Sequence, residues 1–349
     1  MKAYIKNQAQ KVLDHPSISP VSKLFTPVFS GIGSIVMFHR VVPDADHIIC
    51  EDLEITAAHL EAILEYFTRY GYEFVSLDRA HDIISGKQKT SRKFAVFTFD
   101  DGYEDNYSIA YPIFKKYNVP FTIYVTTSFP DKTAIIWWYA LKELIKDNKA
   151  IRFIFEGKNY NYQVETESQK ERVYVELRRL ILSLAKEQQM ILFSSMFGGN
   201  RIDVKRFSSD LTMDWNQIEE LSKDSLVTIG AHTISHSNLK NLDEESARKE
   251  IVDSKNKIEV FTGVEVEHFA FPFGSVNEAG EREFELAGQL GFKTSTTTRC
   301  GNIFPEHAGH MNCLPRITPS PYILSSFPQF YASGFIPALK QNFKRVITH

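Results

Sequence analysis

The segment FAVFTFDDG, residues 94–102, joins a short run of aromatic and β-branched side chains to two adjacent carboxylates and a glycine. Such a run, apolar on both faces, is typical of a strand buried on both sides in a parallel sheet. Adjacent carboxylates at the end of a buried strand are costly unless they have partners or a function. We therefore expect Asp100 and Asp101 to lie where catalytic groups gather in α/β barrels. The simpler alternative is that Asp101 or Asp105 caps the helix that follows.

Similar runs recur along the chain and alternate with segments of helical periodicity. The runs lie at residues 34–39, 72–77, 94–99, 121–127, 227–232, 268–273 and 292–298. Between them, helical periodicity is found at residues 56–69, 105–117, 216–223, 243–261 and 278–290. This alternation fits a barrel or a doubly wound sheet. We favour an α/β fold, a distorted or incomplete (β/α) barrel of about seven strands.

Residues 130–211 break this rhythm. They contain an aromatic helix-like stretch at residues 136–141, an alternating stretch at 151–164 around Gly157-Lys158-Asn159, and helical periodicity over 165–193. The pattern predicts an inserted helix–hairpin–helix subdomain. It could be a lid, an oligomer contact, a substrate rim or a structural elaboration.

The composition is that of a globular protein. The chain has 349 residues, of which 43% are hydrophobic and 24% are charged, and its formal net charge is −3. These values exclude a disordered chain, a collagen-like fibre and a disulfide-dense miniprotein, and they argue against nucleic acid as a partner. Cys50, Cys300 and Cys313 form no C-x-x-C pair, which favours reduced thiols. The predicted parts are an N-terminal helical extension (1–33), a barrel (34–320, interrupted at 130–211) and a C-terminal extension (321–349).

The N-terminal residues lack the uninterrupted apolar stretch of about 7–15 residues that a cleaved signal requires. The most apolar stretch nearby, residues 24–38, is too short to span a bilayer. We therefore expect a cytoplasmic or membrane-peripheral location. Packing of residues 1–33 on a membrane surface stays open but is not indicated, and the oligomeric state is unknown.

Two histidines follow the predicted strand at residues 227–231. His232 and His236 are four positions apart, so that two imidazoles on one turn can face the same cation. Imidazole together with carboxylate suits zinc, and also nickel, cobalt or iron. The alternative is an exposed turn that happens to contain two histidines. A third segment, Phe271-Pro272-Phe273-Gly274, ends another predicted strand and by itself indicates only a rigid turn.

Together, Thr98-Phe99-Asp100-Asp101-Gly102, His232-Thr233-Ile234-Ser235-His236 and Phe271-Pro272-Phe273-Gly274 resemble the motifs of the NodB-type polysaccharide deacetylases, a family of metal-dependent carbohydrate esterases. The resemblance covers about residues 34–320. The stretch at residues 35–41 is similar to the opening strand of the branch that deacetylates poly-N-acetylglucosamine or capsule polymers. The resemblance implies hydrolytic N-deacetylation of N-acetylated amino sugars in a polysaccharide or glycan precursor.

The resemblance also implies a role for each motif residue. Asp101, His232 and His236 would bind a divalent metal, with Zn²⁺ favoured and Co²⁺ or Ni²⁺ as alternatives. Asp100 would be the general base that takes a proton from the attacking water. The metal would lower the pKa of this water and polarise the acetamide carbonyl. A backbone N–H near Tyr103 would help to hold the oxyanion.

Two residues of the commoner family pattern are absent. The position where most relatives carry an arginine that orients the base is Ala270, and the late segment at residues 312–318 lacks the general-acid histidine. As substitutes we predict that Arg316 or Arg40 pairs with the base carboxylate. We also predict that His39 acts as general acid or orients the base. The alternatives are a core histidine for His39 and a salt bridge at the rim for Arg316.

Aromatic residues complete the predicted site. The predicted substrate-binding residues are Tyr103, Pro272, Phe273 and Trp215. Of these, Trp215 is expected to line an acetyl pocket, although a core position would explain it too. Trp137 and Trp138 could stack on sugar rings or simply pack within the insertion. His307 and His310 lie in a loop with glycine and proline and are expected at the surface.

Two other functions stay open on the same residues. One is hydrolysis of a small amide or imide, for which a closed cavity would be expected instead of an open groove. The other is a non-catalytic carbohydrate-binding homologue, which the absent arginine and histidine suggest. In the favoured interpretation the partner is an N-acetylated glycan, and nucleic acid is not a partner.

Overall fold

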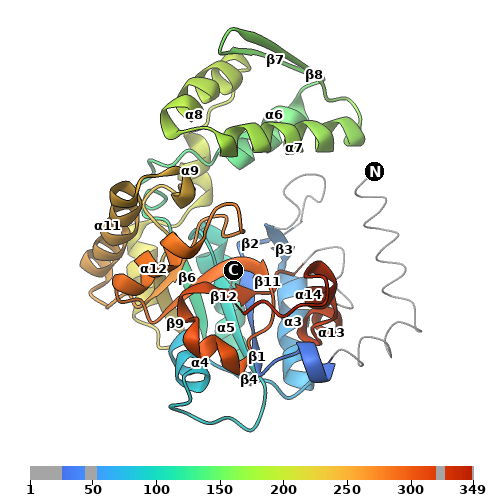
Figure 1. Ribbon diagram of the computed structural model, residues 1–349. Helices are drawn as coiled ribbons and strands as arrows, with labels where there is room; N and C mark the ends of the chain where they lie inside the picture. The colour runs from blue at the N-terminus through green and yellow to red at the C-terminus, as the bar shows by residue number, and fades with distance from the viewer. Residues whose placement is uncertain (1–25, 44–52, 320–326, 348–349) are drawn as a thin grey trace.

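The computed structural model describes residues 26–43, 53–319 and 327–347, so residues 1–25 of the predicted N-terminal extension and Cys50 lie outside the described residues. Within the described ranges, seven parallel strands form a nearly closed barrel with helices around it (Figure 1). In spatial order the strands are β1 (Gly33–Phe38), β5 (Phe94–Phe99), β6 (Phe121–Val125), β9 (Val227–Ala231), β10 (His268–Ala270), β11 (Thr294–Cys300) and β12 (Leu314–Arg316). The predicted distorted (β/α) barrel is confirmed.

Backbone hydrogen bonds connect the first and last strands of the barrel. The N–H of Met37 donates to the carbonyl of Ile317 at 2.9 Å, and the N–H of Ile317 donates to the carbonyl of Ile35 at 2.8 Å. Every residue of β1 and β5 is buried, as is typical of strands covered on both faces. A close approach inside the barrel requires glycine at Gly230, because a Cβ there would lie 2.5 Å from the ring of Tyr124.

The outer helices begin at capping residues that the sequence displays. Thr56 caps α3 (Ala57–Arg69) and Asp243 caps α11 (Glu244–Thr262), each by accepting a backbone N–H of the first turn. The other outer helices are α4 (Leu77–Ile84), α5 (Tyr111–Tyr117), α10 (Trp215–Ser222), α12 (Glu281–Gln289), α13 (Phe327–Ala332) and α14 (Phe335–Lys340). Short 3₁₀ segments are η3 (Leu239–Asn241), η4 (Pro305–Gly309) and η5 (Met311–Cys313). In the described part of the chain, every helix is too short or too polar to cross a bilayer.

One predicted strand is shorter than expected, because a helix begins at its last residue. Residues 72–77 form only the two-residue strand β4 (Glu73–Phe74), which pairs with β5 off the barrel path. The reason is Ser76, whose side chain accepts the N–H of Arg79 and so starts α4. The seventh place in the barrel is taken by β12, which ends at Arg316.

The helix predicted at residues 105–117 begins as the π-helical segment η1 (Asn106–Ala110) and continues as α5. Asp105 makes no side-chain capping bond to it. Its carboxylate instead accepts the N–H of Val41 at 2.9 Å and Nε–H of Arg40 at 2.7 Å. π-helical turns often lie at functional sites. The position of η1 a few residues after Asp100 and Asp101 therefore fits a functional role for these two carboxylates.

The expectation that His307 is a surface residue is wrong. The residue is fully buried, its Nδ1 accepts the N–H of Phe304 at 2.9 Å, and its Nε2–H donates to the carbonyl of Val346 at 2.9 Å. His307 therefore attaches the segment after α14 to the barrel. His310 is half-buried.

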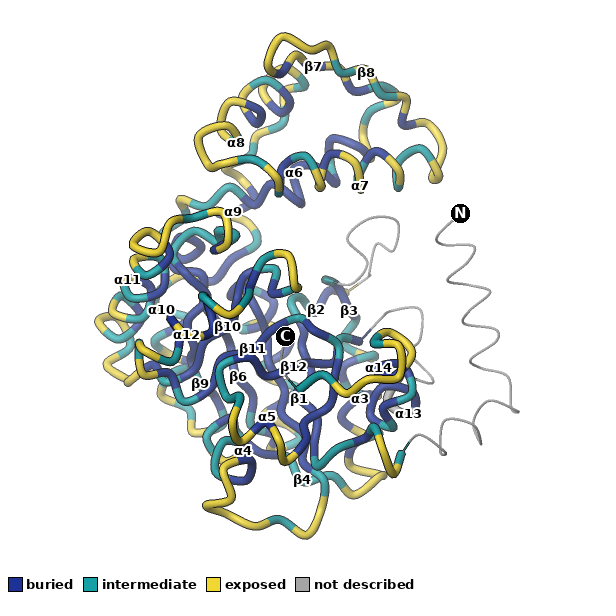
Figure 2. The backbone as a smooth tube through the Cα atoms, viewed as in Figure 1, coloured by how far each residue is buried: buried dark blue, intermediate teal, exposed yellow. Residues whose placement is uncertain are grey.

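The residues between β6 and β9 contain the predicted helix–hairpin–helix unit, called here the insertion (residues 130–211). Its elements are α6 (Trp137–Asp147), β7 (Ala150–Phe155), β8 (Lys158–Gln163), α7 (Glu167–Ser183), α8 (Lys186–Phe193), η2 (Ser194–Gly198) and α9 (Arg206–Leu211). Glu156 and Gly157 make the hairpin turn in left-handed conformations. The insertion has a buried core of its own and projects from the barrel (Figures 1 and 2).

A buried charged network joins the insertion to the barrel. Glu54 lies in β3 (Glu54–Thr56), which pairs with β2 (Arg40–Val42). Its carboxylate accepts a hydrogen bond from the hydroxyl of Tyr139 at 2.8 Å and lies 3.2 Å from Nζ of Lys142, both in α6. Arg40 lies 3.7 Å from the same carboxylate. Since buried charges require compensation, this network holds α6 in place.

Replacement of Glu54 by alanine should destabilise the protein by about 3–5 kcal/mol, because Lys142 and Arg40 would lose a buried counter-charge. The free energy of unfolding in urea, followed by circular dichroism, measures the effect. The matched control is Glu143→Ala on the same helix, since Glu143 pairs with Arg206 at an exposed position; its expected cost is about 0–1 kcal/mol. Equal losses for both variants would contradict the prediction.

Candidate active site

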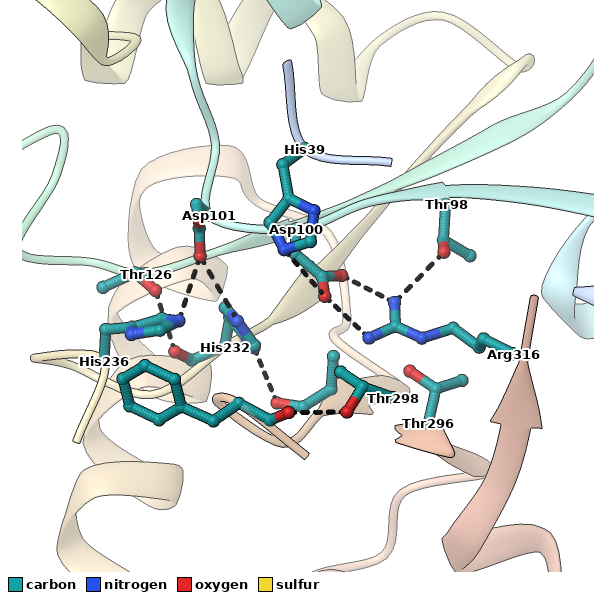
Figure 3. Close-up of polar contacts among 12 residues, drawn as sticks. His39, Thr98, Asp100, Asp101, Thr126, His232, His236, Thr296, Thr298 and Arg316 are labelled. Atoms are coloured by element: carbon teal, nitrogen blue, oxygen red, sulfur yellow. Dashed lines mark hydrogen bonds and ion pairs between the residues drawn. The ribbon is translucent and has the colours of Figure 1, made fainter. Parts of the chain in front are cut away.

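Side chains from the ends of four barrel strands meet at one place (Figure 3). Asp100 and Asp101 follow β5, His232 follows β9, Arg316 ends β12 and His39 follows β1. Because the strands are parallel, their carboxyl ends lie at the same face of the barrel. Residues far apart in the sequence are thereby brought together.

Asp101, His232 and His236 form a compact cluster. One ligand atom from each lies within 4.8 Å of the others. Nε2 of His232 is 3.4 Å and Nε2 of His236 is 3.2 Å from Oδ1 of Asp101. That oxygen is buried and has no hydrogen-bond partner among the described residues. A buried carboxylate oxygen faced by two imidazole nitrogens fits a divalent cation with nitrogen and oxygen ligands.

The backbone around the two histidines fixes their orientation. Nδ1–H of His232 donates to the carbonyl of Ala270 at 2.7 Å, which leaves Nε2 to face Asp101. Glu250 of α11 holds the turn that follows: its carboxylate accepts the N–H groups of Ile234 and Ser235, each at 2.9 Å. A carboxylate outside the cluster thus determines the path of the chain between the two imidazoles.

Backbone strain is concentrated at the same cluster. Asp101 (φ 78°), Thr233 (φ 66°), His236 (φ 54°) and Phe273 (φ 60°) all adopt left-handed conformations that L-residues rarely occupy. Each such residue costs about 1–3 kcal/mol and persists only where the surroundings enforce it. The two histidines are therefore brought together by an irregular turn, and no helix is needed for their spacing.

Arg316 forms a bidentate ion pair with Asp100 at the edge of the cluster. Nη1–H donates to Oδ1 and Nη2–H donates to Oδ2, both at 2.6 Å. The guanidinium, which is fully buried, also donates to the hydroxyl of Thr98 at 3.1 Å and to the carbonyl of Thr297 at 2.9 Å. Arg40, the other arginine considered for this pairing, instead contacts Asp105 and Glu54.

His39 lies over the same carboxylate. Its Nε2 is 4.0 Å from Oδ2 of Asp100, a distance too long for a hydrogen bond. Its Nδ1 is buried and has no partner among the described residues, so the ring is not a core histidine with both nitrogens satisfied. Figure 3 shows the ring beside Asp100 and near Asp101.

The charges around the site shift the pKa values of its groups. Burial alone would raise the pKa of Asp100, but Arg316 and His232 outweigh burial and lower it. His236 and His232 likewise overcome burial and hold the pKa of Asp101 well below its ordinary value. Burial lowers the pKa of His39, against the attraction of both carboxylates. Both carboxylates are consequently ionised at neutral pH.

The structure places two of the four predicted substrate-binding residues beside the cluster. The ring of Phe273 lies 4.6 Å from that of His236, edge to face. Pro272 is buried just before it, and its carbonyl accepts the N–H of Gly274 at 2.7 Å. The Phe-Pro-Phe-Gly turn thus forms a wall next to one histidine.

Tyr103 and Trp215 lie elsewhere. Tyr103 is fully buried in the core of the insertion, where its hydroxyl accepts Nε1–H of Trp138 at 2.9 Å, so its ring is not available to substrate. Trp215 stacks on Phe261 at 4.1 Å and donates Nε1–H to Asp131 at 3.0 Å, in place of the acetyl-pocket position expected for it. Its position at the start of α10 explains this packing.

Trp138 is the aromatic residue of the insertion that reaches the cluster. Its ring lies 5.1 Å from the ring of His236 and 5.4 Å from that of Trp137. A pocket of about 380 Å³ opens here. The insertion lies on one side of it, and the two loops that carry His236 and Phe273 lie on the other.

The contacts that support the site have no signature in the sequence. Glu250 lies in a segment of helical periodicity, and nothing in its spacing indicates that its carboxylate reaches a loop 15 residues earlier. The carbonyl of Ala270 was missed because a backbone acceptor has no sequence signature. Thr98 belongs to the first of the three motifs, yet its hydrogen bond to Arg316 depends on β5 and β12 lying on either side of β1.

A barrel with carboxylates and imidazoles converging at its strand ends has the arrangement of a hydrolase active site. The polysaccharide deacetylase family matches residues 87–198 and 180–294, which is more than half of the chain. The chain belongs to the polysaccharide deacetylase family, whose members are hydrolases that act on amide bonds.

Individual relatives are more distant. The chain is 32% identical over 91 residues to "Putative polysaccharide deacetylase YxkH" of Bacillus subtilis (strain 168), a match that covers 26% of this chain and 30% of that protein. The match thus spans less than a third of that relative's length.

Two solved structures have a similar fold. One is the Streptococcus pyogenes deacetylase PplD in complex with acetate, with 18% identity, a TM-score of 0.56, and coverage of 84% of this chain and 96% of that one. The other is IcaB from Ammonifex degensii, with 19% identity, a TM-score of 0.54, and coverage of 87% and 97%. At this level of identity the likeness shows the fold.

Arg316 and Asp100 should be strongly coupled in a double-mutant cycle. Arg316→Met should lower the free energy of unfolding by about 3–5 kcal/mol, because it leaves a buried carboxylate without its counter-charge. The Asp100→Asn, Arg316→Met double variant should lose less than the sum of the single variants, by about 0.5–3 kcal/mol. Urea unfolding in a chelating buffer measures all four corners. Strict additivity would show that the pair contributes no coupling.

Proposed function

We propose that the protein removes acetyl groups from N-acetylated amino sugars in a polysaccharide or glycan precursor, with a divalent metal as cofactor. The observation that carries the proposal is the buried Oδ1 of Asp101, which faces Nε2 of both His232 and His236 and has a second carboxylate, Asp100, next to it. Membership of the polysaccharide deacetylase family supports the same reaction class.

Asp101, His232 and His236 would hold the cation. The mixture of two imidazoles and one carboxylate fits Zn²⁺ best, with Co²⁺ or Ni²⁺ as alternatives. When bound, such a cation polarises the acetamide carbonyl and lowers the pKa of a water molecule towards ~7.

The neighbouring residues divide the proton transfers between them. Asp100 is proposed to take the proton of the attacking water, and Arg316 holds the carboxylate in position through both oxygens. His39, with Nε2 at 4.0 Å from Oδ2 of Asp100, is proposed to receive that proton from Asp100 and to pass it to the leaving nitrogen, which returns both groups to their starting states. A backbone N–H near Tyr103 is proposed to donate a hydrogen bond to the oxyanion. Water and the amide are thereby converted to acetate and a free amine on the sugar.

The two alternatives lose support from particular observations. The non-catalytic interpretation depended on a missing arginine beside the base, and Arg316 pairs with Asp100 in the required manner. The adjoining pocket of about 380 Å³ would hold either a small amide or a sugar unit, so its volume does not distinguish the two. Membership of the polysaccharide deacetylase family favours the glycan over a small amide.

Metal binding should require the three cluster residues. The wild-type protein should bind about one equivalent of Zn²⁺, and His236→Ala or Asp101→Ala should weaken binding by more than about 100-fold, because even supporting residues around a metal contribute 10–100-fold. Titration of the chelator-treated protein with Zn²⁺ measures the affinity. His310→Ala, a histidine away from the cluster, is the control and should bind as the wild type does. Retention of wild-type affinity in both cluster variants would exclude this metal site.

Acetate release from N-acetylglucosamine oligomers should depend on Asp100. Asp100→Asn should lower kcat by about 10²–10⁴-fold, the usual contribution of a general base, while the Zn²⁺ content stays the same. The control is Asp131→Asn, which removes a carboxylate paired with Lys257 away from the cluster. A wild-type protein that binds metal but releases no acetate from any N-acetyl sugar, free or lipid-linked, would refute the proposed function. Full activity in Asp100→Asn would refute only the role of the base.

A further inference from the structure

The pocket between the insertion and the barrel adjoins the cluster through a continuous series of rings. Trp137 contacts Trp138 (5.4 Å between ring centres), Trp138 contacts His236 (5.1 Å), and His236 contacts Phe273 (4.6 Å). All four residues line the pocket. A group bound in the pocket is thus in contact with the same aromatic wall that borders the proposed metal ligand.

The insertion and the histidine loop also meet directly at the rim. Nζ of Lys186, in α8, lies 3.2 Å from the hydroxyl of Ser235, and Nδ2–H of Asn241 donates to the carbonyl of Leu182 in α7 at 3.0 Å. These contacts make the pocket a bounded site of about 380 Å³. This volume lies within the range of about 300–1,000 Å³ that is usual for small-molecule sites.

The chemistry of the lining suits a sugar ring. Trp137, Phe193 and Met190 offer apolar surface, while the amide of Asn238 and the hydroxyl of Ser237 lie among the same lining residues. A pyranose has an apolar C–H face and a rim of hydroxyl groups, so it matches both kinds of surface. An alkyl chain would match only the apolar part of this lining and would displace water from the polar part without new hydrogen bonds.

The charge of the lining distinguishes between forms of that sugar. Among the lining residues there is one lysine, Lys186, and no aspartate or glutamate. A protonated amine placed there would meet the like charge of Lys186, and the lining residues include no carboxylate to balance it. An N-acetylated unit is neutral and avoids this cost.

We propose that the insertion forms a binding site for the sugar unit next to the one that is deacetylated, and that this neighbouring unit must itself be N-acetylated. The proposal rests on the proposed function and identifies its substrate as an oligomer with at least two adjacent acetylated units. The same selectivity leaves acetylated units between deacetylated ones along the polymer, because a unit that has lost its acetyl group binds poorly in the pocket.

Substrates that differ only in the neighbouring unit test the proposal. For the wild-type protein, kcat/KM for fully acetylated N-acetylglucosamine trisaccharide should exceed that for the monosaccharide at least about tenfold. It should fall about tenfold when the unit beside the acetylated one carries a free amine. Equal values for all three substrates, with acetate still released, would overturn the proposal and leave the proposed function intact. Absence of acetate from every substrate would instead count against the proposed function.

Two adjacent residues of α8 provide a matched pair of variants. Met190 lines the pocket and is 48% exposed, whereas Ile191 is 63% exposed and lies outside the lining. Met190→Glu should raise KM for the fully acetylated trisaccharide about fivefold and reduce the discrimination against the free amine. Ile191→Glu adds the same charge one position away and should behave as the wild type does. Identical behaviour of the two variants would overturn the proposal.

Tryptophan fluorescence gives a reading that does not require catalysis. Two of the three tryptophans of the chain, Trp137 and Trp138, line the pocket. Titration of the wild-type protein with the acetylated trisaccharide should change their emission, and Met190→Glu should shift the titration to higher concentration. A response to an alkyl-chain detergent with none to the trisaccharide would overturn the assignment of a sugar to this pocket.

Discussion

The ion pair between Asp100 and Arg316 is the constraint on which the remainder of the site depends. Two adjacent carboxylates are buried at the end of β5, and each requires compensation that the interior of a barrel does not otherwise supply. Arg316 compensates one of them from the last barrel strand, and the two histidines face the other. Because Arg316 enters from β12, closure of the barrel brings the counter-charge of Asp100 into the site.

The sequence predicts the parts of the site that follow from strand ends. Asp100, Asp101 and His232 each come directly after a run of buried residues, so their convergence follows from the parallel sheet alone. The choice between Arg40 and Arg316 could not be made in this way, because both follow or end barrel strands. The choice depends on Asp105, whose carboxylate accepts hydrogen bonds from Arg40 and from the N–H of Val41 and does not cap the helix that follows. Arg40 is therefore paired with Asp105, and Arg316 pairs with Asp100.

Other features were beyond the reach of sequence patterns for similar reasons. An aromatic residue before a helix, such as Trp215, gives no indication of which face of the barrel it will meet. The burial of His307 depends on a carbonyl near the end of the chain. The hairpin of the insertion was predictable because Gly157 is a local signal, whereas the contact between Trp138 and His236 depends on how the insertion is seated. Features that depend on neighbouring residues can be predicted from the sequence, whereas contacts between distant segments depend on the folded structure.

The position of the insertion has a consequence for the order of events during synthesis. The insertion separates Asp101 from His232 and His236, so the chain cannot form the cluster as a local chelate when the first ligand leaves the ribosome. The whole insertion must be made, and β9 must take its place beside β6, before the three side chains come together. Cation binding at the proposed metal site would therefore require a folded barrel, and an unfinished chain would compete poorly for metal in the cell.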